Sequence, residues 1–216
     1  MASVVAIIVD IVRSRELEDR AAAQTMIEST FAKVAAVHPP VRPLWATVGD
    51  EFQIAMPDVA SAVRTTTLVR LLLTDGVDCR FGLGSGEVIE VRPGASGPIQ
   101  DGSAWWSARD AIDEARRREK STAPYARTWY RAAAAREAAS EGLVNGLLLL
   151  RDELVSGMSP RERRLAAGSM LGRTQVELAA DEGVSQSAVS QNLRRSGAQA
   201  IAAAMDALAP DRRRNS

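Results

Sequence analysis

The sequence predicts an α+β protein in which a ferredoxin-like domain of order βαββαβ is followed by an all-α helix-turn-helix domain. The first observation is the order of elements in the N-terminal half, where β-branched runs alternate with stretches of helical periodicity. The second is the remainder of the chain, which is rich in alanine and leucine and reads as helices. The 216 residues, 46% of them hydrophobic, are enough for two cores.

The N-terminal half begins with residues 3–9, SVVAIIV, an unbroken apolar run typical of a buried central strand. The His-Pro-Pro of residues 38–40 stops the helix that follows, and the Gly-Asp of residues 49–50 joins two strands in a tight hairpin. The Gly-Ser-Gly of residues 84–86 is interpreted as a flexible junction between two further strands. The expected elements are strand 3–9, helix 13–37, strands 44–48 and 51–56, helix 58–73, strands 77–83 and 87–91, helix 103–120, strand 126–130 and helices 132–154 and 160–170.

Residues 174–195, TQVELAADEGVSQSAVSQNLRR, carry the signal for the helix-turn-helix. Thr174 and Ser185 can each cap a helix through the side-chain hydroxyl, and Gly183 lies where the chain must turn at positive φ. The side chains left outside the second helix suit base edges, since glutamine pairs with adenine and arginine with guanine. The alternative is a helical hairpin that only packs against the rest of the protein. The candidate DNA-binding residues are Gln186, Ser187, Ser190, Gln191, Arg194 and Arg195.

Two aspartates are candidate metal ligands. In a βαββαβ domain the end of the first strand lies beside the hairpin between the second and third, so Asp10 and Asp50 should converge. Converging carboxylates can hold Mg²⁺ or Mn²⁺ at the phosphates of a nucleotide, and backbone amides that open a helix can cradle phosphate oxygens. The alternative is that Asp10 caps its helix and Asp50 serves its turn. The nucleotide-binding candidates in the segment after the first strand are Ile11, Val12, Arg13 and Ser14.

The charge distribution and the single cysteine bear on the class of protein and on its cellular location. The formal net charge is zero, but arginines cluster locally at residues 116–118, 161–164, 194–195 and 212–214, as a DNA-binding surface requires. Cys79 is alone, can form no internal disulfide, and is interpreted as a small buried residue of a strand. No apolar run is long enough for a membrane span or a signal peptide, which favours a cytoplasmic protein.

Four segments resemble, in chain order, motifs of the class III nucleotidyl cyclases. VDIVRS resembles the first metal motif, TVGDEF the hairpin motif, CRFGLGSGEV the later strand-and-glycine segment, and DGSAWWSARDAIDEA the helix with the transition-state residues. With the C-terminal segment from SPRERRLAAG onward, nearly the whole chain resembles the SatD family. The resemblance implies that Asp10 and Asp50 match the metal-binding aspartates. It also implies that Arg109 matches the arginine that steadies the transferring phosphate, so Arg109 would be catalytic if the protein is active.

Two departures from the cyclase pattern bear on activity. Trp105 stands where an asparagine is expected four residues before Arg109, and Ala46 replaces the lysine that reads the base. A tryptophan cannot orient a ribose oxygen, so the resemblance implies an inherited scaffold rather than working cyclase chemistry. Trp105 and Trp106 have two interpretations, packing against the sheet or a dimer partner, and stacking on a bound base.

The sequence therefore favours a cytoplasmic DNA-binding transcriptional regulator whose cyclase-like half pairs two copies and senses a nucleotide. A homodimer on double-stranded DNA is expected, because cyclases of this class work as dimers and helix-turn-helix proteins bind paired half-sites. The alternative is a metal-dependent nucleotidyl cyclase or a related nucleotide-polymerising enzyme. The expected domains are a cyclase-like domain 1–131, a connecting helix 132–156, a helix-turn-helix domain 157–210 and a disordered tail 211–216.

Overall fold

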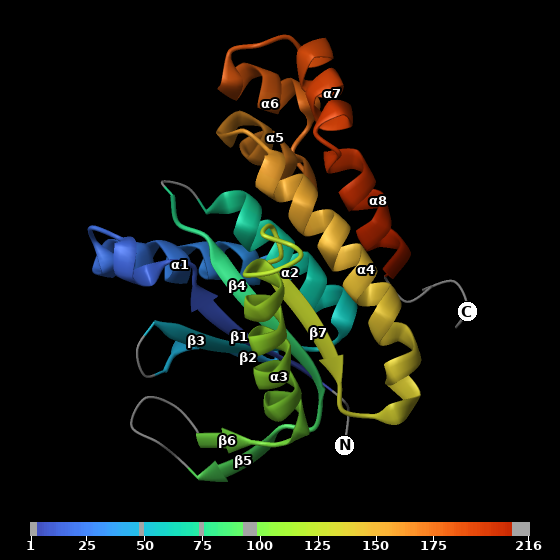
Figure 1. Ribbon diagram of the computed structural model, residues 1–216. Coiled ribbons are helices and arrows are strands. Elements are labelled where there is room, and N and C mark those ends of the chain that lie inside the picture. Colours follow the sequence, from blue (N-terminus) through green and yellow to red (C-terminus); the bar gives the residue numbers. More distant parts are fainter. Residues whose placement is uncertain (1–3, 48–49, 74–75, 93–98, 209–216) are drawn as a thin grey trace.

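A five-stranded sheet is the centre of a mixed α/β protein (Figure 1). The computed structural model describes residues 4–47, 50–73, 76–92 and 99–208. The strand order is β2-β3-β1-β4-β7, with β1 antiparallel to both of its neighbours and β7 parallel to β4. A separate two-stranded ribbon, β5-β6, follows β4. The strands are β1 (Val4–Ile11), β2 (Arg42–Ala46), β3 (Glu51–Met56), β4 (Cys79–Gly86), β5 (Ile89–Arg92), β6 (Ile99–Asp101) and β7 (Thr128–Ala132).

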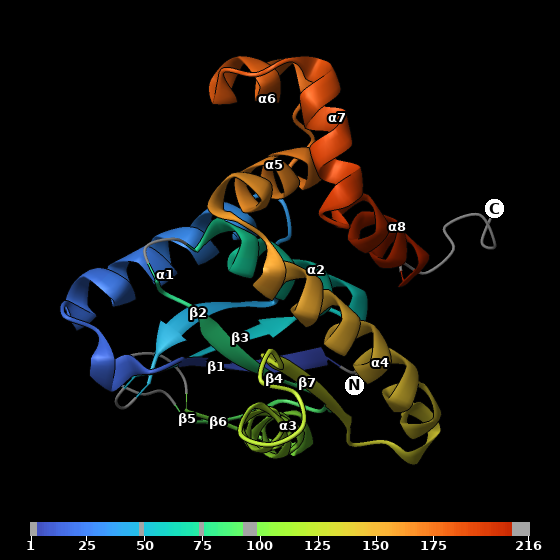
Figure 2. The same ribbon diagram turned by 45° about the horizontal axis from the view of Figure 1, so that its top comes forward.

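Helices cover both faces of the sheet (Figure 2). The alternation of β1 divides the core: Val5, Ile7 and Val9 pack with α1, α2 and α4, whereas Ala6 and Ile8 pack with α3. The side chains of β1 therefore point alternately into two apolar layers, which explains the continuous apolar sequence of this strand. The helices on the sheet are α1 (Arg20–Ala35), α2 (Val59–Leu72), α3 (Ser103–Glu119) and α4 (Ala135–Gly157).

The C-terminal helices extend from α4, and both views place α6 and α7 at the end of the molecule farthest from the strands. Ser159 and Thr174 each begin a helix with a capping box, in which a glutamate three residues later returns a hydrogen bond to the cap. Gly183 ends α6 at φ 64°, in the left-handed conformation that glycine adopts readily. These helices are α5 (Pro160–Met170), α6 (Gln175–Glu182), α7 (Gln186–Arg195) and α8 (Ala198–Leu208).

The expected helix over residues 13–37 is wrong in its first turns. A 3-10 turn, η1 (Ser14–Glu16), is followed by extended backbone at Leu17. Asp19 then starts α1 by accepting a hydrogen bond from the amide of Ala22 at 2.9 Å. The capping aspartate, together with the extended leucine, moves the start of the long helix from residue 13 to residue 20.

The glycines of residues 84–86 are not a flexible junction, because β4 continues through them to Gly86. Their role is to let α3 approach the sheet. A Cβ on Gly84 would lie 2.2 Å from the carbonyl oxygen of Ala104, and one on Gly82 would lie 2.2 Å from that of Ala108. Alternate glycines on one face of β4 therefore accept the backbone of α3 in direct contact.

Other boundaries agree within a few residues, and β3 begins and ends where expected. Cys79 is buried at the start of β4, as interpreted from the sequence. The sequence analysis assigned no element to α8, which packs back on α2: Arg64 of α2 hydrogen-bonds the Met205 carbonyl and the Asp206 carboxylate. Residues 48–49, part of the predicted hairpin turn, and the tail 211–216 lie outside the described residues.

Candidate functional site

Helix α7 presents a polar side to solvent and an apolar side to its neighbours. Val189 and Leu193 are buried, and they hold α7 against α5 and α6. Ser185 caps the helix by accepting a hydrogen bond from the amide of Ala188 at 3.2 Å. Of the polar residues predicted to contact DNA, Ser190 is half-buried. The others are exposed: Gln186, Ser187, Gln191, Arg194 and Arg195.

The arginines on and near α7 differ in whether they form ion pairs. Glu182, at the end of α6, lies 2.6 Å from Arg164 and 3.5 Å from Arg161, and the hydrogen bonds from Arg164 hold the pKa of this glutamate below its usual value. Arg195 is 3.8 Å from Glu162. Within the described part of the chain Arg194 makes no ion pair, so its guanidinium is available to an external anion.

The second candidate site, which we call the strand-end cluster, is a group of charged side chains at the end of β1 on the sheet face that α3 covers. The strand register puts Asp10 opposite Glu51 of β3 and opposite Arg80 of β4. Because Glu51 directly follows Asp50, the two segments that carry the predicted carboxylates meet here. The cluster consists of Asp10, Glu51, Arg80, Arg109, Arg116 and Glu119.

Arginines occupy both oxygens of the Asp10 carboxylate. Oδ2 pairs with Arg80, and Oδ1 lies 3.1 Å from the Arg116 guanidinium of α3. Arg80 is almost fully buried and also pairs with Glu119 at the end of α3. The cluster thus ties the last residues of β1 to both β4 and α3.

The residues do not fit a resident divalent ion in this arrangement. A metal bound by Asp10 would have to displace two guanidinium groups, since both carboxylate oxygens are paired. Among the residues described, no three His, Cys, Asp or Glu side chains are grouped to hold a metal ion. Metal binding by Asp10 and Asp50 stays a prediction that needs Arg80 and Arg116 to move.

Arg109, the predicted phosphate residue, lies one turn of α3 after Trp105. It donates to both carboxylate oxygens of Glu51, at 2.6 and 2.8 Å, and these hydrogen bonds raise the pKa of its guanidinium. The Arg109 side chain is 46% exposed, so an incoming anion can compete with Glu51 for it. The sequence alone did not identify Glu51 as its partner.

The segment after β1 offers fewer free amides than the sequence predicted. Ile11 is buried in the ladder opposite Cys79, and the Val12 amide donates to the Asp78 carbonyl at 2.9 Å. Arg13 has φ 53°, and Ser14 begins the short turn η1 rather than a long helix. The Val12 amide is therefore occupied within the fold, and phosphate binding by the amides of this segment stays a prediction.

The two tryptophans of α3 differ in environment. Trp105 is buried against the sheet, and its ring meets that of Trp45 edge-on at a centroid distance of 5.6 Å. Trp106 is 63% exposed and donates from Nε1 to Asp101 at 2.8 Å. Trp105 is thus a packing residue, whereas the ring of Trp106 is open to solvent.

A cleft of about 340 Å³ lies beside these rings, between α3 and the sheet. Trp105 and Trp106 form part of its wall together with Arg109 and Gln53. Trp105 therefore lines this cleft without filling the space beside Arg109.

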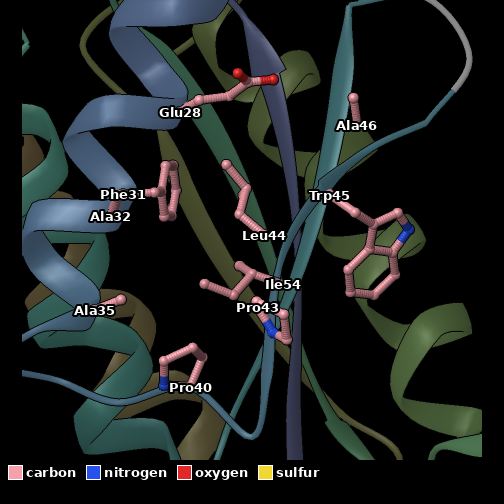
Figure 3. A pocket seen from close by; sticks show the side chains of 10 residues that line it. All are labelled: Glu28, Phe31, Ala32, Ala35, Pro40, Pro43, Leu44, Trp45, Ala46 and Ile54. Carbon is pink, nitrogen blue, oxygen red and sulfur yellow. The ribbon is translucent and has the colours of Figure 1, made fainter. Parts of the chain in front are cut away.

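The other side of β2 borders a separate cavity of about 330 Å³. Figure 3 shows Phe31, Leu44 and Ile54 gathered between α1 and the sheet, with the ring of Trp45 turned away from them. Its walls are apolar apart from Glu28, and Ala46 is at the end of β2. No predicted nucleotide or DNA residue lines this cavity. It lies on the α1 side of the sheet, whereas the cleft at Arg109 lies on the α3 side.

Sequence reasoning missed Arg80 and Arg116, which hold Asp10. Arg80 carried a signal, because it is a charged residue inside the otherwise apolar run of β4. A charge at such a position needs a buried partner. Arg116 carried no such signal, because it is one of three consecutive arginines that look alike in the sequence. Its neighbour Arg117, for example, pairs within its own helix.

A family model gives the comparison with known proteins. The model of the SatD family matches residues 4–148, from β1 into α4. No curated protein matches the chain. None of the helices in the described part of the chain has the length and apolar character needed to span a membrane.

Proposed function

This chain belongs to the SatD family, and we propose that it is a DNA-binding transcriptional regulator whose cyclase-like half dimerises and binds a nucleotide without turning it over. The observation that carries the proposal is the open polar side of α7, with Gln191 and Arg194 facing solvent at the end of the molecule farthest from the sheet. The matched residues, 4–148, end before α5, so the family match does not bear on the helices proposed to bind DNA.

The proposed DNA contact is the insertion of α7 into the major groove, as in a helix-turn-helix. The capped α6, the left-handed Gly183 and the buried Val189 support this geometry, because they fix α7 across α6 while its polar side stays free. Gln191 would read adenine by donating to N7 and accepting from N6, and Arg194 would read guanine by donating to both O6 and N7.

Sequence-selective binding tests the proposal. Sites would be selected from a random duplex library and from the DNA upstream of the protein's own operon, and affinity measured by fluorescence anisotropy over a salt series. Gln191→Ala and Arg194→Ala should each cost about 1–3 kcal/mol on the selected site and relax specificity there. A lost phosphate contact would instead lower the salt slope by about one.

Two exposed residues provide matched controls. Gln199 on α8 and Arg117 on α3 lie outside the proposed surface, so Gln199→Ala and Arg117→Ala should bind as the wild type does. If the wild-type protein shows no sequence preference at moderate salt, α7 is not a recognition helix and the proposal fails.

The proposed dimer would use α4. Leu143 and Leu150 are 79% and 69% exposed, and with Leu147 and Leu154 they recur at intervals of four, three and four residues. This is the spacing of a coiled-coil seam. Pairing of two α4 helices would cover the stripe and hold two copies of α7 for two half-sites.

The proposed nucleotide site is the cleft beside Arg109. The strand order β2-β3-β1-β4 supports the ferredoxin-like, cyclase-type assignment, and the half-exposed Arg109 supplies a cation for phosphate. ATP or GTP, with and without Mg²⁺, should raise the melting temperature of the wild type, because a ligand that binds only the native state stabilises it. Arg109→Ala should abolish this rise, and Asp50→Ala should remove any part of it that depends on Mg²⁺.

The enzymatic alternative is a nucleotidyl cyclase or a nucleotide-polymerising enzyme. The meeting of the Asp10 and Asp50 segments beside Arg109 favours it, and the pairing of Asp10 with two arginines weighs against it. Incubation with ATP or GTP and Mn²⁺ followed by chromatography decides the matter. A cyclic or linear product that disappears in Asp10→Ala would establish catalysis, and unchanged nucleotide would reject it.

A further inference from the structure

A cleft of about 510 Å³ separates the sheet half of the molecule from the C-terminal helices. Leu71 and Leu73 at the end of α2 and Val77 before β4 form one wall, and Met158 and Arg163 at the start of α5 form the other. Its volume lies within the range of about 300–1,000 Å³ typical of small-molecule sites. It is larger than the cleft beside Arg109 and contains none of the predicted metal, nucleotide or recognition-helix residues, although Arg163 belongs to the arginine cluster at residues 161–164.

Arg163 is the unmatched charge in this cleft. The side chain is half-buried, and its buried Nε has no hydrogen-bond partner within the described residues. Burial, and then the nearby Arg70, lower the pKa of Arg163. Its neighbours on α5 differ, because Arg161 and Arg164 both pair with Glu182.

Among the described residues, the carboxylate that lines the cleft is Asp78, and it is already bound to two other arginines. Asp78 accepts hydrogen bonds from Arg70 and Arg127 on its two oxygens, and from the Cys79 amide on Oδ1.

The carboxylates behind the cleft are already paired with other arginines. Arg70 and Arg151 share the buried Asp152, and Arg70 and Arg127 share Asp78. Arg127 also pairs with Glu119, so these three arginines are matched by three carboxylates and none of the three is left over for Arg163. A half-buried cation in such surroundings is stabilised by an anion from outside.

We propose that this cleft binds a small organic monoanion with an apolar body, its charged group on Arg163 and its body against Leu71, Leu73 and Met158. An apolar wall with one cation at its edge selects for both parts of such a ligand. Because the cleft is formed by α2 on one side and α5 on the other, an occupant contacts both halves of the chain. Binding does not depend on the proposed DNA contact, although any effect on the position of α7 does.

Calorimetric titration of the full-length protein tests the site with three probes: octanoate, inorganic phosphate and octanol. Octanoate should bind and raise the melting temperature, and it should bind at least ten times more tightly than octanol or phosphate. Arg163→Gln should weaken octanoate binding at least tenfold, and Arg163→Lys should recover part of it. Arg161→Gln, which removes a neighbouring charge that lies outside the cleft and that Glu182 already pairs, should bind octanoate as the wild type does.

The melting temperature of the free Arg163→Gln protein provides a second readout. If Arg163 serves a ligand, its removal should leave the free protein as stable as the wild type, or more stable, because an unmatched half-buried charge is lost. A structural role predicts a lower melting temperature instead. Three results would each overturn the proposal: no octanoate binding at millimolar concentration, equal binding of octanol, or unchanged octanoate binding by Arg163→Gln.

Discussion

Asp152 on α4 is the residue whose neutralisation should most destabilise the fold. It is fully buried; its Oδ1 lies 2.9 Å from the Arg70 and Arg151 guanidinium groups, and its Oδ2 accepts from the amides of Arg127 and Thr128 at 2.7 Å. Asp152→Asn keeps the shape but removes the charge, and its amide NH₂ must face a donor whichever way it turns. Breaking a buried pair of this kind costs about 3–5 kcal/mol.

Urea and thermal unfolding measure this cost. For a chain of this length each kcal/mol lowers the melting temperature by about 2–4 °C, so Asp152→Asn should melt about 6–20 °C below the wild type. Glu153→Gln is the matched control, because it makes the same chemical change at the next, exposed residue and should shift stability by no more than about 0.5 kcal/mol. An Asp152→Asn protein within about 1 kcal/mol of the wild type would refute the assignment of Asp152 as the structural counter-ion of two buried arginines.

Three further changes test other parts of the structure. Gly84→Ala should destabilise by about 1–3 kcal/mol in chemical unfolding, because its Cβ would meet the backbone of α3, whereas Gly146→Ala, where a Cβ meets open space, should be neutral or stabilising. Leu143→Glu with Leu150→Glu should turn the proposed dimer into a monomer in light scattering while leaving secondary structure by circular dichroism unchanged. For Asp78, burial raises the pKa, but Arg70 and Arg127 outweigh it and hold the pKa below its usual value. Its stabilising effect is therefore present above the unfolded-state pKa and is lost as pH falls below about 4, where the stability difference between the wild type and Asp78→Asn should shrink.

Signals that act over a few residues were readable from the sequence. Ser159 and Thr174 begin helices because each hydroxyl meets an amide and a glutamate within its own first turn. Gly183 marks its turn because few other residues adopt the left-handed conformation. The bounds of α5, α6 and α7 were therefore predicted closely from local chemistry, whereas α8 was not predicted.

Long-range packing set the limits of prediction. A glycine is common both in turns and where a helix meets a strand, so Gly84 suggested a junction until α3 was seen to rest on it. Asp10 fitted a metal motif. Its partners Arg80 and Arg116 lie 70 and 106 residues away, and no residue near Asp10 in the chain indicated them. The predicted topology brought the strand-end segments together, but it did not indicate which charged side chains pair with them.

A continuous series of ion pairs connects the strand-end cluster to α4. Asp10 pairs with Arg80, Arg80 with Glu119, and Glu119 with Arg127. Arg127 pairs with Asp78, which shares Arg70 with Asp152 on α4.

Because buried charges are costly to separate, this series fixes the C-terminal part of α4 to the rest of the sheet domain. If two chains pair along α4 as proposed, that helix carries α5 to α7 as a rigid arm. Ligand control of the distance between two α7 helices would then have to act at the junction of α4 and α5, where this series of ion pairs does not reach. The Arg163 cleft lies at that junction, between α2 and α5.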